Sequence, residues 1–175
     1  MKKIKYNTNK FNFAEQLQNL FNIEKLDSIN DLVPVFERKN DQNTKYHKLY
    51  YDWIRQDNSK LLYENFINEV VRPLYDESIV YQAIPTFRVC YPNNIAVGEF
   101  HKDKNYRNIE WAEKVNELNY FMPLTNAFDT NTIWVESEED KGDFAPMNCN
   151  YGEIIQWDGS NLSHGNKLNK TGKCR

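Results

Sequence analysis

The sequence contains few cysteines and no paired arrangement of them. Cys90, Cys149 and Cys174 are its three cysteines among 175 residues, and no two of them form a CxxC pair. A disulfide framework or a thiolate zinc site needs cysteines in pairs at short spacing. The sequence therefore predicts neither, and we expect the three thiols to be buried or incidental.

Long hydrophobic segments and a strong excess of one charge are also absent. After the basic start MKK, the segment IKYNTNKFNF alternates polar with apolar residues and is too polar for secretion or membrane spanning. The net charge of -3 does not suit a protein that neutralises nucleic-acid phosphates. We therefore expect a cytoplasmic protein with no membrane partner and no nucleic-acid partner.

The composition that remains is that of a folded protein. Hydrophobic residues make up 40% of the chain, aromatic residues 14% and charged residues 27%. These fractions are typical of a globular protein rather than a disordered one. The length suits one domain with a substantial core, so we predict a single domain over residues 1–175.

The first part of the chain, residues 1–77, has the apolar spacing of helices. Apolar residues recur there at intervals of three and four, which predicts amphipathic helices. Asn58 and Ser59 are candidate caps of the last helix, and Pro73 marks where it should end or kink. We expect this part to form a helical cap or support.

Residues 78–175 instead contain short β-branched and aromatic runs separated by Pro, Asn, Asp and Gly. The runs are SIVYQAIPTFRVCY, IAVGEFH, LNYFMPLT, NTIWVES, GEIIQWDG and LSHGN. Such a series without intervening helices predicts antiparallel strands rather than a βαβ sheet, and no glycine-rich phosphate loop is present. The predicted fold is mainly β with an α-helical N-terminal part, and residues 78–175 form a jelly-roll or barrel core.

His101 and Asp103 stand two residues apart in EFHKDKNYRN, where a predicted strand ends. Side chains at i and i+2 of an extended segment point to the same side, so both can reach one ion. The pair alone is weak evidence, because an incidental ion pair with Lys102 or Lys104 in a solvated loop also fits it.

His164 is the third candidate ligand, and it follows a predicted β-turn at Asp158-Gly159. Two histidines and one carboxylate form the facial triad of non-haem Fe(II) oxygenases, which leaves three adjacent coordination positions open. A turn histidine before Gly165 is the alternative. We predict that the remaining histidine, His47, packs in the helical part or lies on a solvated helix face.

Arg175 follows His164 beyond the turn-like segment NKLNKTGK. A planar guanidinium grips a carboxylate through two parallel hydrogen bonds, which a lysine cannot do. Arg175 is therefore a candidate anchor for a dicarboxylate beside the metal, and an ordinary surface cation is the alternative.

Taken in order, the motifs HKD, NTIWVES, YGEIIQWDG, HGN and NKTGKCR resemble the 2-oxoglutarate- and Fe(II)-dependent oxygenases. The resemblance covers about residues 80–175. It is nearest to the phytanoyl-CoA-hydroxylase-like branch and to the oxygenases of streptomycin-type and surface-carbohydrate gene clusters. It implies a double-stranded β-helix (a cupin-like jelly roll). It also implies hydroxylation of a small-molecule substrate of carbohydrate or aminocyclitol type with Fe(II), 2-oxoglutarate and O₂.

Matched position by position, the resemblance implies that His101, Asp103 and His164 bind the iron. It implies that Arg175 binds the distal carboxylate of 2-oxoglutarate, and it implies no catalytic residue beyond the metal ligands. In the family the strand that carries the arginine continues for several residues, whereas this sequence stops at Arg175. We therefore expect the last strand to be cut short.

The motifs fix no other contact of the cosubstrate. Arg88 and Thr86, in the run PTFRVCY, are further candidates for binding it. The segment 105–117 next to the metal loop is either a lid or a short helix that fills the connection. The acidic run ESEEDKGD, residues 136–143, is predicted to be a solvated loop.

Two other functions fit the same sequence. A catalytically inert jelly-roll module could bind a carbohydrate through aromatic residues such as Trp134 and Trp157, although aromatic residues in strands more often belong to the core. A cupin-like isomerase or epimerase would use the metal or a histidine to move a proton, without 2-oxoglutarate.

Overall fold

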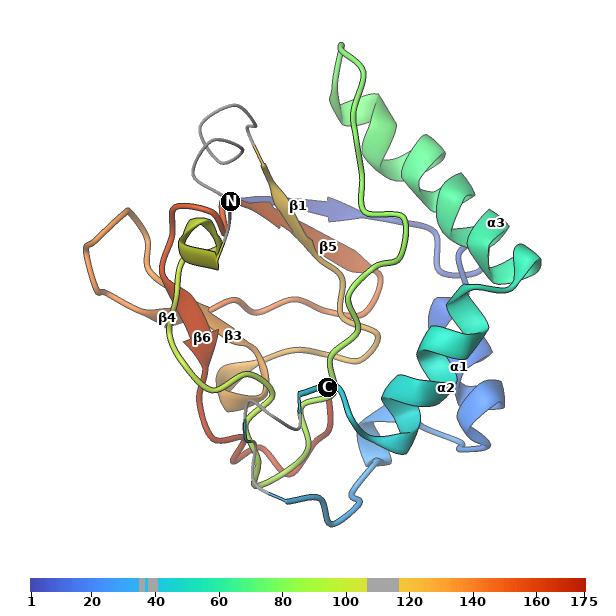
Figure 1. Cartoon of the computed structure of the whole chain (residues 1–175), viewed down its shortest axis with the longest axis horizontal. Coiled ribbons are helices and arrows are strands. Elements are labelled where there is room, and N and C mark those ends of the chain that lie inside the picture. Colours follow the sequence, from blue (N-terminus) through green and yellow to red (C-terminus); the bar gives the residue numbers. More distant parts are fainter. Residues whose placement is uncertain (35–36, 38–40, 107–116) are drawn as a thin grey trace.

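The computed structural model describes residues 1–34, 37, 41–106 and 117–175. Its longer helices lie on one side of the molecule and its strands on the other (Figure 1). The α-helices are α1 (Phe13–Phe21), α2 (Lys45–Ile54) and α3 (Asp57–Phe66). The strands are β1 (Lys2–Lys5), β2 (Asn119–Phe121), β3 (Ile133–Val135), β4 (Ala145–Pro146), β5 (Glu153–Trp157) and β6 (His164–Asn166).

The end of the last long helix was predicted well and its start was not. Helix α3 continues through a π-helical turn, Ile67–Val71, into a 3₁₀ turn that contains Pro73, after which the backbone is extended. The helix begins at Asp57, after an extended Gln56, so it starts two residues earlier than a cap at Asn58 predicts, and Asn58 and Ser59 lie inside it and are not caps. Three consecutive polar residues that favour helix starts made the sequence ambiguous here.

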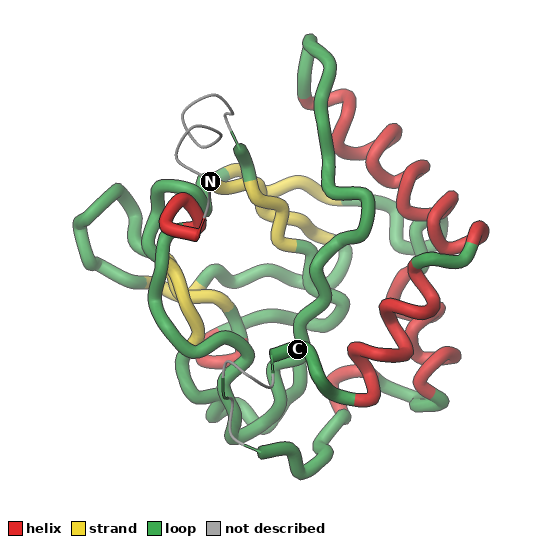
Figure 2. The backbone as a smooth tube through the Cα atoms, in the orientation of Figure 1, coloured by secondary structure: helices red, strands yellow, loops and turns green. Residues whose placement is uncertain are grey.

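The buried faces of the helices pack against one face of the first sheet. Leu17 of α1 and Ile154 of β5 are each only 1% exposed and belong to the same core cluster. Figure 2 shows the helices in red beside the yellow strands. His47 of α2 packs into this layer, as predicted: it is 5% exposed, and its ring centroid lies 5.6 Å from that of Phe87.

The first sheet has the strand order β1-β5-β2 and is antiparallel throughout. Strand β1 was not predicted as a strand, because Lys2, Lys3 and Lys5 leave Ile4 as its one apolar residue. Ile4 pairs with Ile154 and packs against the helical core. A single apolar contact thus orients a strand that the hydrophobic pattern does not reveal.

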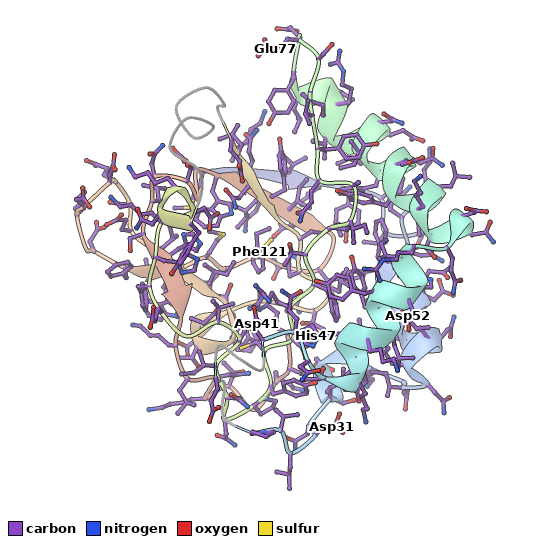
Figure 3. The ribbon with its side chains drawn as sticks, in the orientation of Figure 1. Asp31, Asp41, His47, Asp52, Glu77 and Phe121 are labelled. Atoms are coloured by element: carbon purple, nitrogen blue, oxygen red, sulfur yellow. The ribbon has the colours of Figure 1, made fainter. Side chains whose placement is uncertain are left out.

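The second sheet has the order β4-β3-β6, and a second core cluster fills the space between the two sheets. Phe121 and Ile155 contribute to it from the first sheet, and Val135 contributes from the second. Figure 3 labels Phe121 near the centre of the molecule. Trp157 also belongs to this cluster at 4% exposure, so it is a core residue as expected for aromatics in strands.

The β part has less regular structure than the sequence suggested. Within the described residues, the strands form two small antiparallel sheets and close no barrel, so the fold is mixed α/β with a modest β content. The predicted strands at 78–91 and 95–101 are largely irregular. Pro85 cannot donate a hydrogen bond to a ladder, and Val80 is 101% exposed with no sheet face to cover.

Several smaller expectations have direct outcomes. Cys90, Cys149 and Cys174 are buried free cysteines, as predicted. No helix in the described part of the chain is long and apolar enough to cross a bilayer. Of the proposed lid, residues 107–116 lie outside the described residues, so that prediction has no structural outcome.

Candidate metal centre

His101 and His164 lie directly opposite each other on neighbouring segments. The amide nitrogen of each donates to the carbonyl oxygen of the other, at 2.9 Å in both directions, so residue 101 adds one pairing position to the free edge of β6. Residues that exchange both backbone hydrogen bonds carry their side chains on the same face of the sheet. The two imidazole centroids are consequently 4.5 Å apart.

Asp103 completes the group from the start of a 3₁₀ turn, Asp103–Tyr106. Its Oδ1 atom lies 3.5 Å from Nε2 of His101 and 3.6 Å from Nε2 of His164. One candidate ligand atom from each residue lies within 4.8 Å of the others. Ligands bound to one ion at about 2.1 Å are about 3–4 Å from one another, so this geometry could hold a metal ion after small movements.

The backbone orients both imidazoles in the same way. Nδ1 of His101 lies 2.8 Å from the carbonyl oxygen of Glu99, and Nδ1 of His164 lies 2.9 Å from that of Leu162. A carbonyl oxygen only accepts, so in the neutral form of each ring Nδ1 carries the proton and Nε2 presents a lone pair, whereas protonated His101 can donate from Nε2 to Asp103. Metal-binding histidines are usually held by a second hydrogen bond of this kind.

The electrostatic surroundings of the three residues differ. The hydrogen bond to Asp103 is the main reason that the pKa of His101 is raised, while burial lowers the pKa of His164. Burial acts to raise the pKa of Asp103, but the hydrogen bonds from His101 and Asn119 and the two imidazoles outweigh it, so the pKa is lowered. The carboxylate and His164 are thus already in the protonation states that a metal requires.

Arg175 lies on the inner side of the first sheet. Its guanidinium carbon is 5.2 Å from the ring centroid of Phe121, and its Nε donates to the carbonyl oxygen of Asn131 at 2.7 Å. The backbone of Arg175 exchanges two hydrogen bonds with Cys90. Phe121 and Asn119 are two residues apart on β2, so their side chains lie on the same face of the strand. Arg175 therefore packs on the face of β2 that also carries Asn119, which donates a hydrogen bond to Asp103.

The two other candidate cosubstrate contacts have different surroundings. Arg88 forms an ion pair with Asp41 at 2.6 Å, and its positive charge is a minor influence that lowers the pKa of His101. Thr86 is exposed, and its hydroxyl accepts a hydrogen bond from Gln82 at 3.2 Å. Arg88 is thus paired with Asp41 and Thr86 with Gln82, and neither of these contacts involves a candidate metal ligand.

Comparison with known proteins found a relative that matches nearly the full length of this chain. No protein-family model matches the chain. The streptomycin biosynthesis protein StrG of Streptomyces griseus is 31% identical over 173 residues, which is 99% of this chain and 79% of the relative. The chain belongs to the StrG family.

Two side chains that support the centre of this StrG-family chain were not found from the sequence. Asn119 donates to Oδ2 of Asp103 at 2.8 Å. Glu136 accepts a hydrogen bond from the amide nitrogen of Ser163, next to His164, at 2.6 Å. Both residues are remote in sequence from the residue that they hold, so no local motif could reveal them.

Residues 137–143 of this StrG-family chain are exposed, as predicted for the acidic loop, but Glu136 is an exception. The residue opens the run 136–143 but is only 1% exposed, and its second oxygen accepts from the amide nitrogen of Gly142 at 3.1 Å. These backbone hydrogen bonds satisfy its charge, and they lower the pKa of its carboxyl. A buried carboxylate therefore ties the acidic loop to the strand that carries His164.

Two acidic residues of the run, Glu139 and Asp140, pair with the lysines that flank Asp103. Lys102 binds Glu139 at 3.0 Å and Asp140 at 2.6 Å, and Lys104 binds Glu139 at 2.6 Å. The side chain of Lys102 is 13% exposed, so its pair with Glu139 and Asp140 is partly shielded from solvent. Lys102 and Lys104 thus pair with the acidic loop. Asp103 instead contacts His101.

Proposed function

We propose that this StrG-family protein is an Fe(II)- and 2-oxoglutarate-dependent oxygenase that hydroxylates a small molecule of carbohydrate or aminocyclitol type. The observation that carries the proposal is the convergence of two Nε2 atoms and one carboxylate oxygen of His101, His164 and Asp103. Two imidazoles and one carboxylate are the ligand set that suits Fe(II) with open positions. When bound, Fe(II) with 2-oxoglutarate and O₂ supplies the oxidising power of the reaction.

The residues of the chain have distinct roles in this proposal. His101, Asp103 and His164 hold the iron, and Arg175 binds the distal carboxylate of 2-oxoglutarate. The carbonyl of Asn131 fixes Nε of Arg175, which orients the guanidinium for a two-pronged grip by its other nitrogens. Arg88 is a further candidate contact for the anionic cosubstrate. The cosubstrate would compete with Asp41 for the guanidinium of Arg88. Thr86 is the weakest of the candidate contacts, because its hydroxyl is exposed and bound to Gln82.

The fold supports the proposal at a coarser level. Two facing sheets with a shared core, and metal ligands at one edge, are the ingredients of a double-stranded β-helix whose strands are short here. We therefore interpret residues 78–175 as the jelly-roll core and 1–77 as its helical support within a single domain. The relative acts in streptomycin biosynthesis by name, and streptomycin is built from sugar and aminocyclitol rings, which supports the proposed substrate class.

The test is conversion of 2-oxoglutarate to succinate by the purified protein with Fe(II), with and without a panel of sugars and aminocyclitols. His101→Ala should lower succinate formation at least about 100-fold, because the iron loses one of three ligands. His47→Phe is the matched control, since it replaces the histidine outside the centre and should retain turnover. Equal turnover in wild type and His101→Ala would refute the proposal. Stoichiometric metal without succinate would favour the cupin-like isomerase.

A further inference from the structure

Asn119 makes hydrogen bonds with both ends of its amide group. Its Oδ1 accepts from the amide nitrogen of Gly159 at 3.1 Å, and its Nδ2 donates to Oδ2 of Asp103 at 2.8 Å. The two ends of an amide are distinguished by such partners, because a backbone N–H can only donate and a carboxylate can only accept. The orientation of the Asn119 side chain is therefore determined by its surroundings.

The carboxylate of Asp103 consequently has two unlike oxygens. Oδ1 faces both imidazoles, at 3.5 Å from Nε2 of His101 and 3.6 Å from Nε2 of His164. Oδ2 is held by Asn119 on the other side. The amide nitrogen of Asp103 donates to the carbonyl oxygen of Gly159 at 3.0 Å, so one turn fixes both the backbone and, through Asn119, the side chain.

We propose that Asn119 is a positioning residue that restricts Asp103 to binding the metal through one oxygen. A carboxylate can bind an ion through one oxygen or through both, and the second mode occupies an additional coordination position. By holding Oδ2, Asn119 keeps that position open for a ligand that needs two adjacent sites. This inference rests on the proposed metal centre and not on any particular reaction.

Gly159 offers a second way to disturb the same hydrogen bonds. A Cβ atom at residue 159 would lie 2.7 Å from Oδ1 of Asn119, too close for the amide to stay in place. Gly159→Ala should therefore displace the Asn119 side chain without changing Asn119 itself. Asn119→Leu removes the hydrogen bonds at similar volume, and the two variants disturb one contact from opposite sides.

The test uses Co(II), which has a visible spectrum that reports its coordination, and oxalate, a small anion that needs two adjacent positions. In Asn119→Leu and Gly159→Ala, we expect Co(II) affinity to stay within about 10-fold of wild type. Oxalate affinity of the Co(II)-loaded protein should fall by at least about 10-fold. The visible spectrum before oxalate is added should already differ from that of wild type. A purely structural role would not separate these readouts.

Tyr120→Phe is the matched control, because it removes a hydrogen-bonding group from the same strand. Its hydroxyl bonds to Tyr75 and Gln156 rather than to the centre, so Co(II) and oxalate binding should match wild type. Unchanged oxalate affinity and an unchanged spectrum in both site variants would overturn the inference. If Asn119→Leu does not fold, Gly159→Ala and Asn119→Ser decide the question. A wild-type protein that binds no Co(II) would refute the metal centre itself, whereas Co(II) binding without succinate formation would refute only the oxygenase reaction.

Discussion

The two histidines of the candidate centre differ in how strongly they bind a proton. The pKa of His101 is raised above the ordinary value of 6.5 by its hydrogen bond to Asp103, while burial keeps that of His164 low. A metal ion must therefore displace a proton chiefly from His101 as the pH falls. The lowered pKa of Asp103 keeps its carboxylate ionised over the same range.

We therefore expect the affinity for Co(II) to rise with pH through 6.5 and above. The slope should approach about tenfold per pH unit below the pKa of His101, because one proton leaves for each ion bound, and it should flatten above that pKa. Titrations of the apo protein with Co(II) at pH values between about 5.5 and 8.5 measure this. An affinity that does not change with pH in this range would contradict the assignment of His101 as a ligand.

How much of the centre the sequence predicts depends on the type of contact. His101, Asp103 and His164 were identified from short motifs, and the structure brings their ligand atoms within 4.8 Å. Asn119 was missed because an asparagine in a strand has many uses and its partner lies elsewhere in the sequence. Glu136 was misjudged because acidic residues are rarely buried unless several backbone amides bind them.

At the level of elements, the close approach of two chain segments depends on Gly165. A Cβ atom there would lie 2.9 Å from Cδ2 of Phe100 and 3.1 Å from its Cα, so the segment that carries His101 would have to move away from β6. The backbone pairing of His101 with His164 would lengthen as a result. The close approach of Phe100 thus explains why a glycine, with no side chain, suits position 165 beside the candidate centre.

Gly165→Ala should weaken Co(II) binding by about 10-fold or more and cost about 1–3 kcal/mol of stability, because the added methyl overpacks a buried contact. Isothermal titration and chemical unfolding measure the two effects. Gly172→Ala is the control: a Cβ there meets nothing within 4 Å, although its φ of +71° makes alanine strained. The control should lose stability and retain metal affinity. Equal metal affinity in Gly165→Ala and wild type would show that the segments do not need this approach.

Elements were predicted best where the sequence has a strong period. The helices follow their apolar spacing, whereas the strand series overestimated the sheet content, because a β-branched run becomes a strand only if a partner edge is available. Residues 78–91 lack such a partner over most of their length and pair with the chain end at Cys90 and Arg175. Strand β1 is the opposite case. Its hydrophobic pattern is weak, but it forms a strand because it pairs with the free edge of β5.

At the scale of the whole molecule, the helical layer contains a histidine that links stability to pH. His47 is 5% exposed, and burial, together with the nearby Arg88, lowers its pKa to about 4, with Asp41 acting in the opposite direction. Thr44 contacts its Nδ1 at 2.8 Å. The unfolded chain, with an ordinary histidine pKa, binds a proton between about pH 6.5 and 4 that the folded protein does not bind.

The folded state should therefore lose about 1–3 kcal/mol of stability through His47 as the pH falls from about 6.5 towards 4. Chemical unfolding of wild type and His47→Phe at pH 7 and at pH 4.5 measures it, since phenylalanine keeps a ring beside Phe87. His164 titrates in the same direction, so the difference between the two proteins isolates the share of His47. Parallel pH dependence in both proteins would show that His47 is not the group responsible.

The reciprocal pairing of His101 with His164 gives a bound ion a second consequence. The ion would act as a reversible cross-link between two distant points of the chain, closing the loop that contains β2 to β5. Such a clip lowers the conformational entropy of the unfolded chain if it persists there, and it favours the folded chain in any case by mass action. Starvation for the metal would then reduce the amount of intact protein as well as its catalytic capacity, so that supply and turnover in the cell become coupled.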